Sequence, residues 1–159
     1  MIKLRRKDRE VTDKNDIISI ISKCNVCRLG LVDDGEPYVV PMNFGFEFDG
    51  VNLTLYFHSA KEGRKIDILR KNPLVCFEMD CGHELISGGT DIYKYSYKYE
   101  SVIGIGNAEF IEGYDEKVYA FKKIMAKYAG TEDFDFPPES VSKVAIIKIQ
   151  SNEYTGKKY

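Results

Sequence analysis

The chain has 159 residues, which is enough to bury the core of one domain without disulfides or metal ions. Hydrophobic residues make up 43% and charged residues 30%, which excludes a disordered chain, and the net charge of −2 gives no general attraction for nucleic acid. No stretch approaches the roughly 20 apolar residues of a membrane span, and the start lacks the apolar core of a secretory leader. We therefore expect one cytoplasmic domain over residues 1–159, with no membrane or nucleic-acid partner.

The first part of the chain predicts one helix followed by strands. Isoleucines at helical spacing predict a helix over residues 12–23, with Thr12 or Asp13 as its cap. Pro41 cannot donate a hydrogen bond to a neighbouring strand, so it predicts a sheet edge or a bulge. Asp34-Gly35 is a strong hairpin signal. The strands that flank and follow this turn are expected over residues 26–32, 38–48 and 53–57.

The second part predicts two more helices. One covers residues 65–71 and ends before Asn72-Pro73, because the residue before a proline avoids helical angles. The other is capped by Asp115, and its expected core face is Val118, Phe121, Ile124, Met125 and Tyr128. Strands are expected over residues 74–79, 93–111 and 144–149, with a glycine-rich loop over 81–90 and a connector over 131–139. Strands in hairpin order with three helices predict an α+β barrel, because a doubly wound sheet needs a helix after nearly every strand.

Four alternating tyrosines mark the strand expected over residues 93–111. Tyr93, Tyr95, Tyr97 and Tyr99 would share one face of that strand. An ordinary amphipathic strand explains them, and so does an aromatic wall at a dimer interface or over a cofactor.

The segment of residues 56–65 has the chemistry of a phosphate cradle. A strand ends at His58-Ser59, a glycine follows, and Arg64-Lys65 open a helix. The free amides of a helix start favour an anion, and hydroxyl, guanidinium and ammonium groups converge there. A solvated basic turn capped by Ser59 is the alternative. Upstream, a strand edge beside Asn43 offers backbone groups to a planar heterocycle, unless Pro41 merely protects that edge.

Together, the segments 38–46, 56–65 and 101–109 resemble the pyridoxamine-phosphate-oxidase-like FMN-binding split barrels. Within that group the chain is most similar to the 5-nitroimidazole-resistance (Nim) reductase-like proteins, from the strand at residues 27–31 to the closing residues 154–157. The resemblance implies a six-stranded antiparallel split β-barrel with flanking helices. It also implies FMN at the interface of a homodimer, and electron transfer from NAD(P)H through FMN to a small organic acceptor. The arginine-rich carboxy-terminal signature of true pyridoxamine-phosphate oxidases is absent, so vitamin B6 oxidation is not expected.

The resemblance also implies which residues contact the cofactor. His58 and Ser59 would lie beside the ribityl chain and phosphate, and Arg64 and Lys65 would hold the phosphate. Because adjacent strand residues face opposite ways, His58 and Ser59 should not both point at the phosphate. The residues implied along the flavin ring are Val40, Pro41, Met42, Asn43 and Phe44, and those implied to reach the partner's flavin are Ser101 and Val102.

Several alternatives stay open at this stage. His58 is a candidate catalytic proton donor, a flavin, substrate or haem contact, or a structural residue. The whole protein could instead be a non-catalytic flavin- or haem-binding module, or a reductase that uses a deazaflavin. Cys24 and Cys27, with Cys81 and His83, offer only one pair at metal-ligand spacing, so no metal is expected and the thiols should be reduced. The glycines near residue 104 lack the third glycine of a dinucleotide loop.

Overall fold

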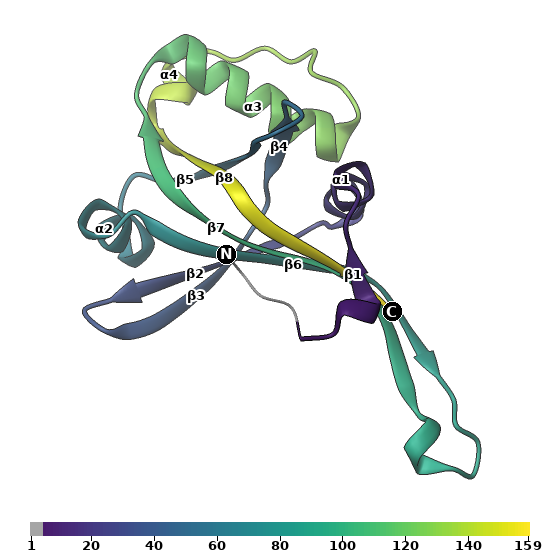
Figure 1. Cartoon of the computed structure of the whole chain (residues 1–159). Coiled ribbons are helices and arrows are strands. Elements are labelled where there is room, and N and C mark those ends of the chain that lie inside the picture. The colour runs from purple at the N-terminus through teal and green to yellow at the C-terminus, as the bar shows by residue number, and fades with distance from the viewer. Residues whose placement is uncertain (1–4) are drawn as a thin grey trace.

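The computed structural model describes residues 5–159, which form a curled antiparallel sheet with helices packed against it (Figure 1). The strands of this described part are β1 (Glu10–Val11), β2 (Cys27–Asp33), β3 (Glu36–Met42), β4 (Gly45–Phe48), β5 (Leu53–Ala60), β6 (Leu74–Ile86), β7 (Ser96–Ile111) and β8 (Val144–Lys158). The helices are α1 (Lys14–Lys23), α2 (Arg64–Lys71), α3 (Tyr114–Ala129) and α4 (Pro138–Ser142), with short 3₁₀ turns η1 (Lys7–Arg9) and η2 (Ile92–Lys94). None of the helices within residues 5–159 has the length and apolar character needed to cross a membrane.

The sheet order is β3-β2-β6-β7-β8-β5-β4, with β1 paired to β8, and every pairing is antiparallel. The α+β class and the split-barrel sheet are therefore confirmed, although the described chain forms eight strands rather than six. The hairpin prediction is also confirmed, because Asp34 and Gly35 both have positive φ, 48° and 92°, as a tight hairpin turn requires.

The expected strand over residues 38–48 is wrong, because the structure divides it in two. β3 pairs with β2, where Pro41 lies opposite Arg28, whereas β4 pairs with β5, where Phe46 lies opposite Leu55. The two pieces thus lie at opposite ends of the sheet order. Nothing in the local apolar pattern marks the break, because it depends on which distant strands each half meets. β3 is a sheet edge, as Pro41 predicted.

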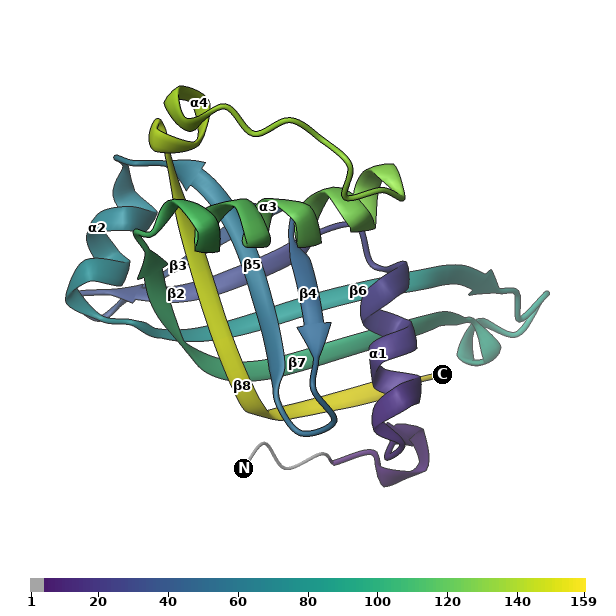
Figure 2. The ribbon, with the colours of Figure 1, turned by 90° about the horizontal axis from the view of Figure 1, so that it is seen from above.

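The expected loop over residues 81–90 is confirmed only for residues 87–90. β6 continues to Ile86 and pairs with β7, so that the two strands form an arm that projects from the body (Figures 1 and 2). The register shifts between Cys81 and Glu84, where Gly82 has φ of +69°, and this bulge accounts for the glycine that suggested a loop. Tyr93 falls in η2 at the far end of the arm, so the four tyrosines do not share one strand face.

The predicted ends of the helices are partly confirmed. Asp13 caps α1, because its carboxylate accepts the backbone N–H of Asn15 at 2.7 Å. α3 instead begins at Tyr114, behind Gly113, and no side chain caps it, so Asp115 lies in its first turn. Of the core face expected for α3, Ile124 is buried and Tyr128 is exposed, while Lys117 and Ala120, which were not expected, are buried. The expected last strand extends beyond residue 149 to the end of β8.

β5 is buried on both faces and therefore separates two clusters of apolar side chains. Leu55 and Phe57 face the main core, which also receives side chains from α1, α2, β2 and β6. Tyr56 faces the other way, towards Ala120 and Ile124 of α3. Figure 2 shows α3 lying across β4, β5 and β8, and α1 lying across β6, β7 and β8.

Candidate functional site

His58 and Ser59 lie on opposite faces of β5, as the alternation of a strand predicts. Ser59 is 6% exposed, and its Oγ has no hydrogen-bond partner among the described residues. An unpaired buried hydroxyl costs on the order of 1–3 kcal/mol. His58 is exposed on the face of α3, with its ring 6.1 Å from that of Phe121. A bound molecule could therefore supply the hydrogen-bond partner that the Ser59 hydroxyl lacks. His58 is not part of the core.

The start of α2 is open to an anion. Gly63 is the N-cap residue, with φ of +120°, and no side chain caps the exposed amides. A positive φ favours glycine, so this residue permits the turn from β5 into α2. Lys65 follows in the first turn, where it is half-buried and forms no ion pair within residues 5–159. Free amides, a helix dipole and an ammonium group are the chemistry of a phosphate site.

Arg64 is engaged elsewhere. Its Nε lies 3.0 Å from Asp33 Oδ2, and its Nη2 lies 3.5 Å from Glu36 Oε2. Its guanidinium also lies 4.9 Å from the ring centre of Tyr38. These contacts connect α2 to the β2–β3 hairpin. The family resemblance implied that Arg64 holds the phosphate. The proximity of the hairpin carboxylates is not visible in the sequence, because it arises only from the pairing of β2 with β3 and β6.

The five residues predicted along the flavin ring have different surroundings. Val40 and Met42 are half-buried and pack on the main core, whereas Pro41 and Asn43 are exposed. Phe44 is fully buried in that core. The free edge of β3 and the turn into β4 are therefore available for backbone contacts, while the side chain of Phe44 is not.

Ser101 and Val102 also face opposite sides of their strand, β7. Val102 is fully buried and lies opposite Met79 of β6, so its side chain belongs to the core of its own chain. Ser101 is half-buried on the outer face, along which Cys76 and Ile103 are exposed. Of the two residues predicted to reach a partner, only Ser101 presents its side chain to the outside.

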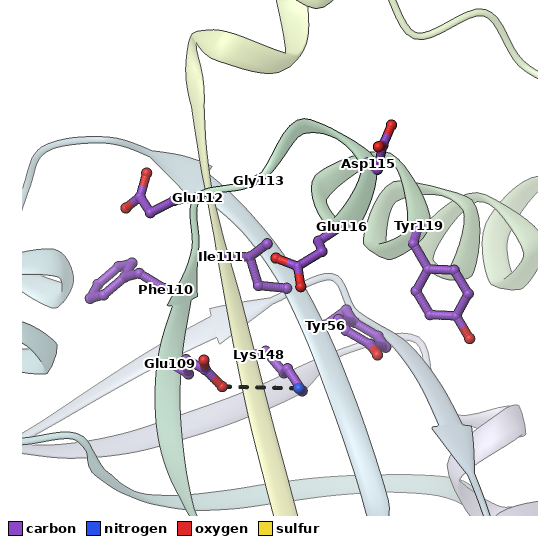
Figure 3. A pocket seen from close by; sticks show the side chains of 10 residues that line it. All are labelled: Tyr56, Glu109, Phe110, Ile111, Glu112, Gly113, Asp115, Glu116, Tyr119 and Lys148. Atoms are coloured by element: carbon purple, nitrogen blue, oxygen red, sulfur yellow. Dashed lines mark ion pairs between the residues drawn. The ribbon is translucent and has the colours of Figure 1, made fainter.

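A cavity of about 440 Å³ lies beside the start of α3 and contains none of the predicted site residues (Figure 3). Two tyrosines of its lining donate hydrogen bonds to the carboxylate of Glu47, Tyr56 Oη at 2.6 Å and Tyr119 Oη at 2.5 Å. Burial and the bond to Glu47 raise the pKa of Tyr56. Lys148, 3.9 Å from Glu109, is the one cation of the lining, against the carboxylates of Glu109, Glu112, Asp115 and Glu116. This excess of negative charge disfavours a phosphate.

The cysteines are distributed between core and surface. Cys24 and Cys27 are buried, and burial raises the pKa of Cys24 to about 12. His83 is exposed and lies 2.8 Å from Asp80. Within residues 5–159, no three His, Cys, Asp or Glu side chains are arranged to hold a metal ion.

Comparison with known proteins places this geometry in a family. The family model described as pyridoxamine 5'-phosphate oxidase matches residues 13–158. Comparison with curated protein sequences gave no match. A solved structure of a candidate 5-nitroimidazole antibiotic resistance protein from Bacteroides thetaiotaomicron is 40% identical, with a TM-score of 0.80 over 94% of this chain and 86% of that chain.

Two further solved structures share the fold at lower identity. The flavocytochrome Anf3 from Azotobacter vinelandii is 18% identical, with a TM-score of 0.79 over 99% of this chain and 72% of that chain. The FAD and heme binding protein from Mycobacterium smegmatis is 14% identical, with a TM-score of 0.78 over 94% and 73% of the two chains. The match to the family model, together with the 40% identical structure, shows that the chain belongs to the pyridoxamine 5'-phosphate oxidase family.

Proposed function

We propose that this protein is a cytoplasmic, FMN-dependent oxidoreductase, which passes electrons from NAD(P)H to a small organic acceptor. The observation that carries the proposal is the buried, unpaired Oγ of Ser59 at the end of β5, five residues before the first residue of α2, whose exposed amides no side chain caps. A bound flavin would supply the redox chemistry, whereas the chain would position it and limit its access to water. The 40% identity to a candidate nitroimidazole-resistance protein supports a nitro compound as the acceptor class.

The residues at the end of β5 fit a phosphate in distinct roles. The Ser59 hydroxyl would donate to one phosphate oxygen and so gain the partner that the chain does not provide. The amides of the first turn of α2 and the ammonium of Lys65 would neutralise its charge. Arg64 would act by connecting α2 to Asp33 and Glu36, or would release them to reach the phosphate. Lys65 therefore carries the main charge-assisted contact in this proposal.

The ring would lie along the free edge of β3. Val40 and Met42 face the interior of the split barrel, and the backbone from Pro41 to Asn43 offers unpaired groups at the edge. A compact cradle for one phosphate favours FMN over a dinucleotide.

We further propose that the active unit is a homodimer. The outer face of β2, β3, β6 and β7 exposes apolar side chains, among them Val39 and Ile103, and Ser101 lies on the same face. Burial of these side chains against a second copy would remove them from water and bring Ser101 to the partner's flavin. Val102 would contribute only its backbone, because its side chain is in the core.

The experiment that tests the proposal is a titration of FMN in a calorimeter. Loss of the Lys65 ammonium in Lys65→Ala removes a charge-assisted hydrogen bond worth about 1.5–3 kcal/mol. FMN affinity should therefore fall roughly tenfold to somewhat over a hundredfold. The control is Lys71→Ala, which removes the same charge from the other end of α2, where Lys71 lies 3.7 Å from Asp34. Wild-type affinity in Lys65→Ala would show that the phosphate lies elsewhere.

Three companion measurements separate the remaining alternatives. Riboflavin lacks the phosphate and should bind wild type and Lys65→Ala about equally. An absorption spectrum, with mass identification of the released molecule, distinguishes FMN from FAD, deazaflavin and haem. Steady-state oxidation of NADH or NADPH with a nitroaromatic acceptor distinguishes an enzyme from a binding module.

A further inference from the structure

A second cavity, of about 220 Å³, lies on the flank of α2 opposite the β2–β3 hairpin. It is enclosed by the loop after β5, by α2, by the end of β7, by the start of α3 and by the start of β8. Its polar lining consists of Lys61, Arg70, Lys117 and Glu112, and Phe110 and Ala145 contribute apolar wall. Neither Arg64 nor Lys65 lines it, so it is distinct from the phosphate cradle proposed above.

The charges around this cavity do not balance. Lys61, Arg70 and Lys117 bring three positive charges from three different elements, and Glu112 brings one negative charge. Within the described residues none of the three cations forms an ion pair, although Arg70 lies 5.9 Å from the ring centre of Phe110. Converging like charges in a concave wall repel one another and attract an anion.

The flank of α2 that faces the β2–β3 hairpin has a different charge balance. There the cations of the helix are matched by the β2–β3 hairpin. Arg64 pairs with Asp33 and Glu36, and Lys71 lies 3.7 Å from Asp34. On the cavity flank, Arg70 shares the wall with two more cations and with only one carboxylate, that of Glu112. The fold therefore neutralises one side of α2 and leaves the other positive.

Lys117 gives the second, independent observation. This lysine is only 5% exposed, and its Nζ donates one hydrogen bond, to the carbonyl of Val144 at 3.0 Å. A lysine ammonium has three donors, and a buried ammonium is stable only when it is paired and hydrogen-bonded. The cavity that it lines is where an external acceptor with negative charge would complete its bonding.

We propose that this cavity binds a phosphate dianion, either inorganic phosphate or the phosphomonoester of a nucleotide. Lys117 would bind the dianion at the floor, the forked guanidinium of Arg70 would bind two of its oxygens, and Lys61 would bind it at the mouth. The single carboxylate of Glu112 offsets one of the three positive charges, so the four side chains together remain positively charged. If the proposed function is correct, the 2'-phosphate of NADPH is the phosphomonoester that such a site would recognise, and it would distinguish NADPH from NADH.

The cavity is tested by calorimetric titration of inorganic phosphate into FMN-saturated protein, in a low-salt buffer free of phosphate. Lys61→Gln and Arg70→Gln should each weaken phosphate binding at least tenfold. The matched control Lys71→Gln, on the hairpin flank of the same helix, should bind phosphate like wild type. FMN affinity should be unchanged in all three variants. Wild-type protein that binds no phosphate, or variants that bind it as tightly as wild type, would overturn the proposal.

A second arm identifies the source of the phosphate. If the site serves NADPH, 2'-phospho-ADP-ribose displaces inorganic phosphate, and Lys61→Gln lowers kcat/KM for NADPH but not for NADH. If the site serves free phosphate, phosphate binding stays sensitive to Lys61→Gln while the preference between the two nucleotides is unchanged. The phosphate titration is also made on protein without FMN, in the Lys65→Ala background, so failure of the FMN proposal and failure of this one are distinguishable.

Discussion

The hydroxyl of Tyr128 accepts the backbone N–H of Phe44 at 3.1 Å, across 84 residues of sequence. The same hydroxyl donates to the carbonyl of Asn25 at 2.7 Å. One side chain from the last turn of α3 thus satisfies the backbone at two places, between α1 and β2 and between β3 and β4. Because the break between β3 and β4 borders the proposed flavin edge, this bond positions the candidate site.

Replacement of that hydroxyl gives the first prediction. Tyr128→Phe should lower the free energy of unfolding by about 0.5–1.5 kcal/mol, the net value of a hydrogen bond, because the part-buried N–H of Phe44 loses its partner while water can replace the bond to the exposed carbonyl of Asn25. Urea denaturation measures the change. The control is Tyr93→Phe at the end of the projecting arm. Tyr93 is 92% exposed, so removal of its hydroxyl should leave the free energy of unfolding unchanged.

The contact between β4 and α3 gives the second prediction. A Cβ added at Gly45 would lie 2.4 Å from the backbone nitrogen of Ile124 and 2.5 Å from the carbonyl carbon of Lys123. Backbone cannot move aside as a side chain can, so Gly45→Ala should destabilise the protein by about 1–3 kcal/mol or more. At Gly30 of β2 the nearest atom to an added Cβ is 3.5 Å away, so Gly30→Ala is the matched control. Equal melting temperatures of the two variants would contradict the prediction.

The third prediction concerns His58. Because this side chain lies on the face opposite Ser59, His58→Ala should leave FMN affinity within a few-fold of wild type. It is exposed, so its loss should change the melting temperature little. If His58 donates a proton to the acceptor, acceptor reduction slows in His58→Ala while FMN affinity is kept. The exposed His83, which pairs with Asp80, is the control histidine. Unchanged turnover together with a lower melting temperature would make His58 a structural residue.

The fourth prediction is a pH dependence of stability. Hydrogen bonds from Lys23 and from Lys158, the latter at 2.9 Å, lower the pKa of Glu100 below its ordinary value of 4.5. A carboxyl whose folded pKa is lowered stabilises the fold fully above its unfolded pKa and loses that contribution as pH falls through the folded value. Glu100→Gln should therefore lower the free energy of unfolding by about 1 kcal/mol at neutral pH.

The difference between wild type and Glu100→Gln should shrink as pH falls below about 4.5 and vanish below the folded pKa. Urea denaturation over this pH range measures it. Glu84, whose side chain is 66% exposed and lies 2.8 Å from Lys98, provides the control Glu84→Gln, because such exposed pairs contribute little. A difference that stayed constant at all pH values would contradict the assignment to Glu100.

Features that depend on neighbouring residues could be predicted from the sequence. The cap at Asp13, the hairpin turn at Asp34-Gly35 and the end of α2 before Pro73 each follow from local backbone preferences. The alternation that separates His58 from Ser59 is local as well, because successive side chains of a strand face opposite ways. The family was also evident in the sequence, because its motifs are short contiguous segments.

Contacts between groups far apart in the sequence could not be predicted, because they depend on how the strands pair and the helices pack. The division of residues 38–48 into β3 and β4 depends on pairing with β2 and β5, which no local pattern encodes. The engagement of Arg64 by Asp33, and the burial of Lys117 beside Arg70, arise because the sheet brings separate elements together. Burial and charge balance are sums over all neighbours in space. They therefore decide whether a residue that looks like a phosphate ligand in the sequence is free to bind one.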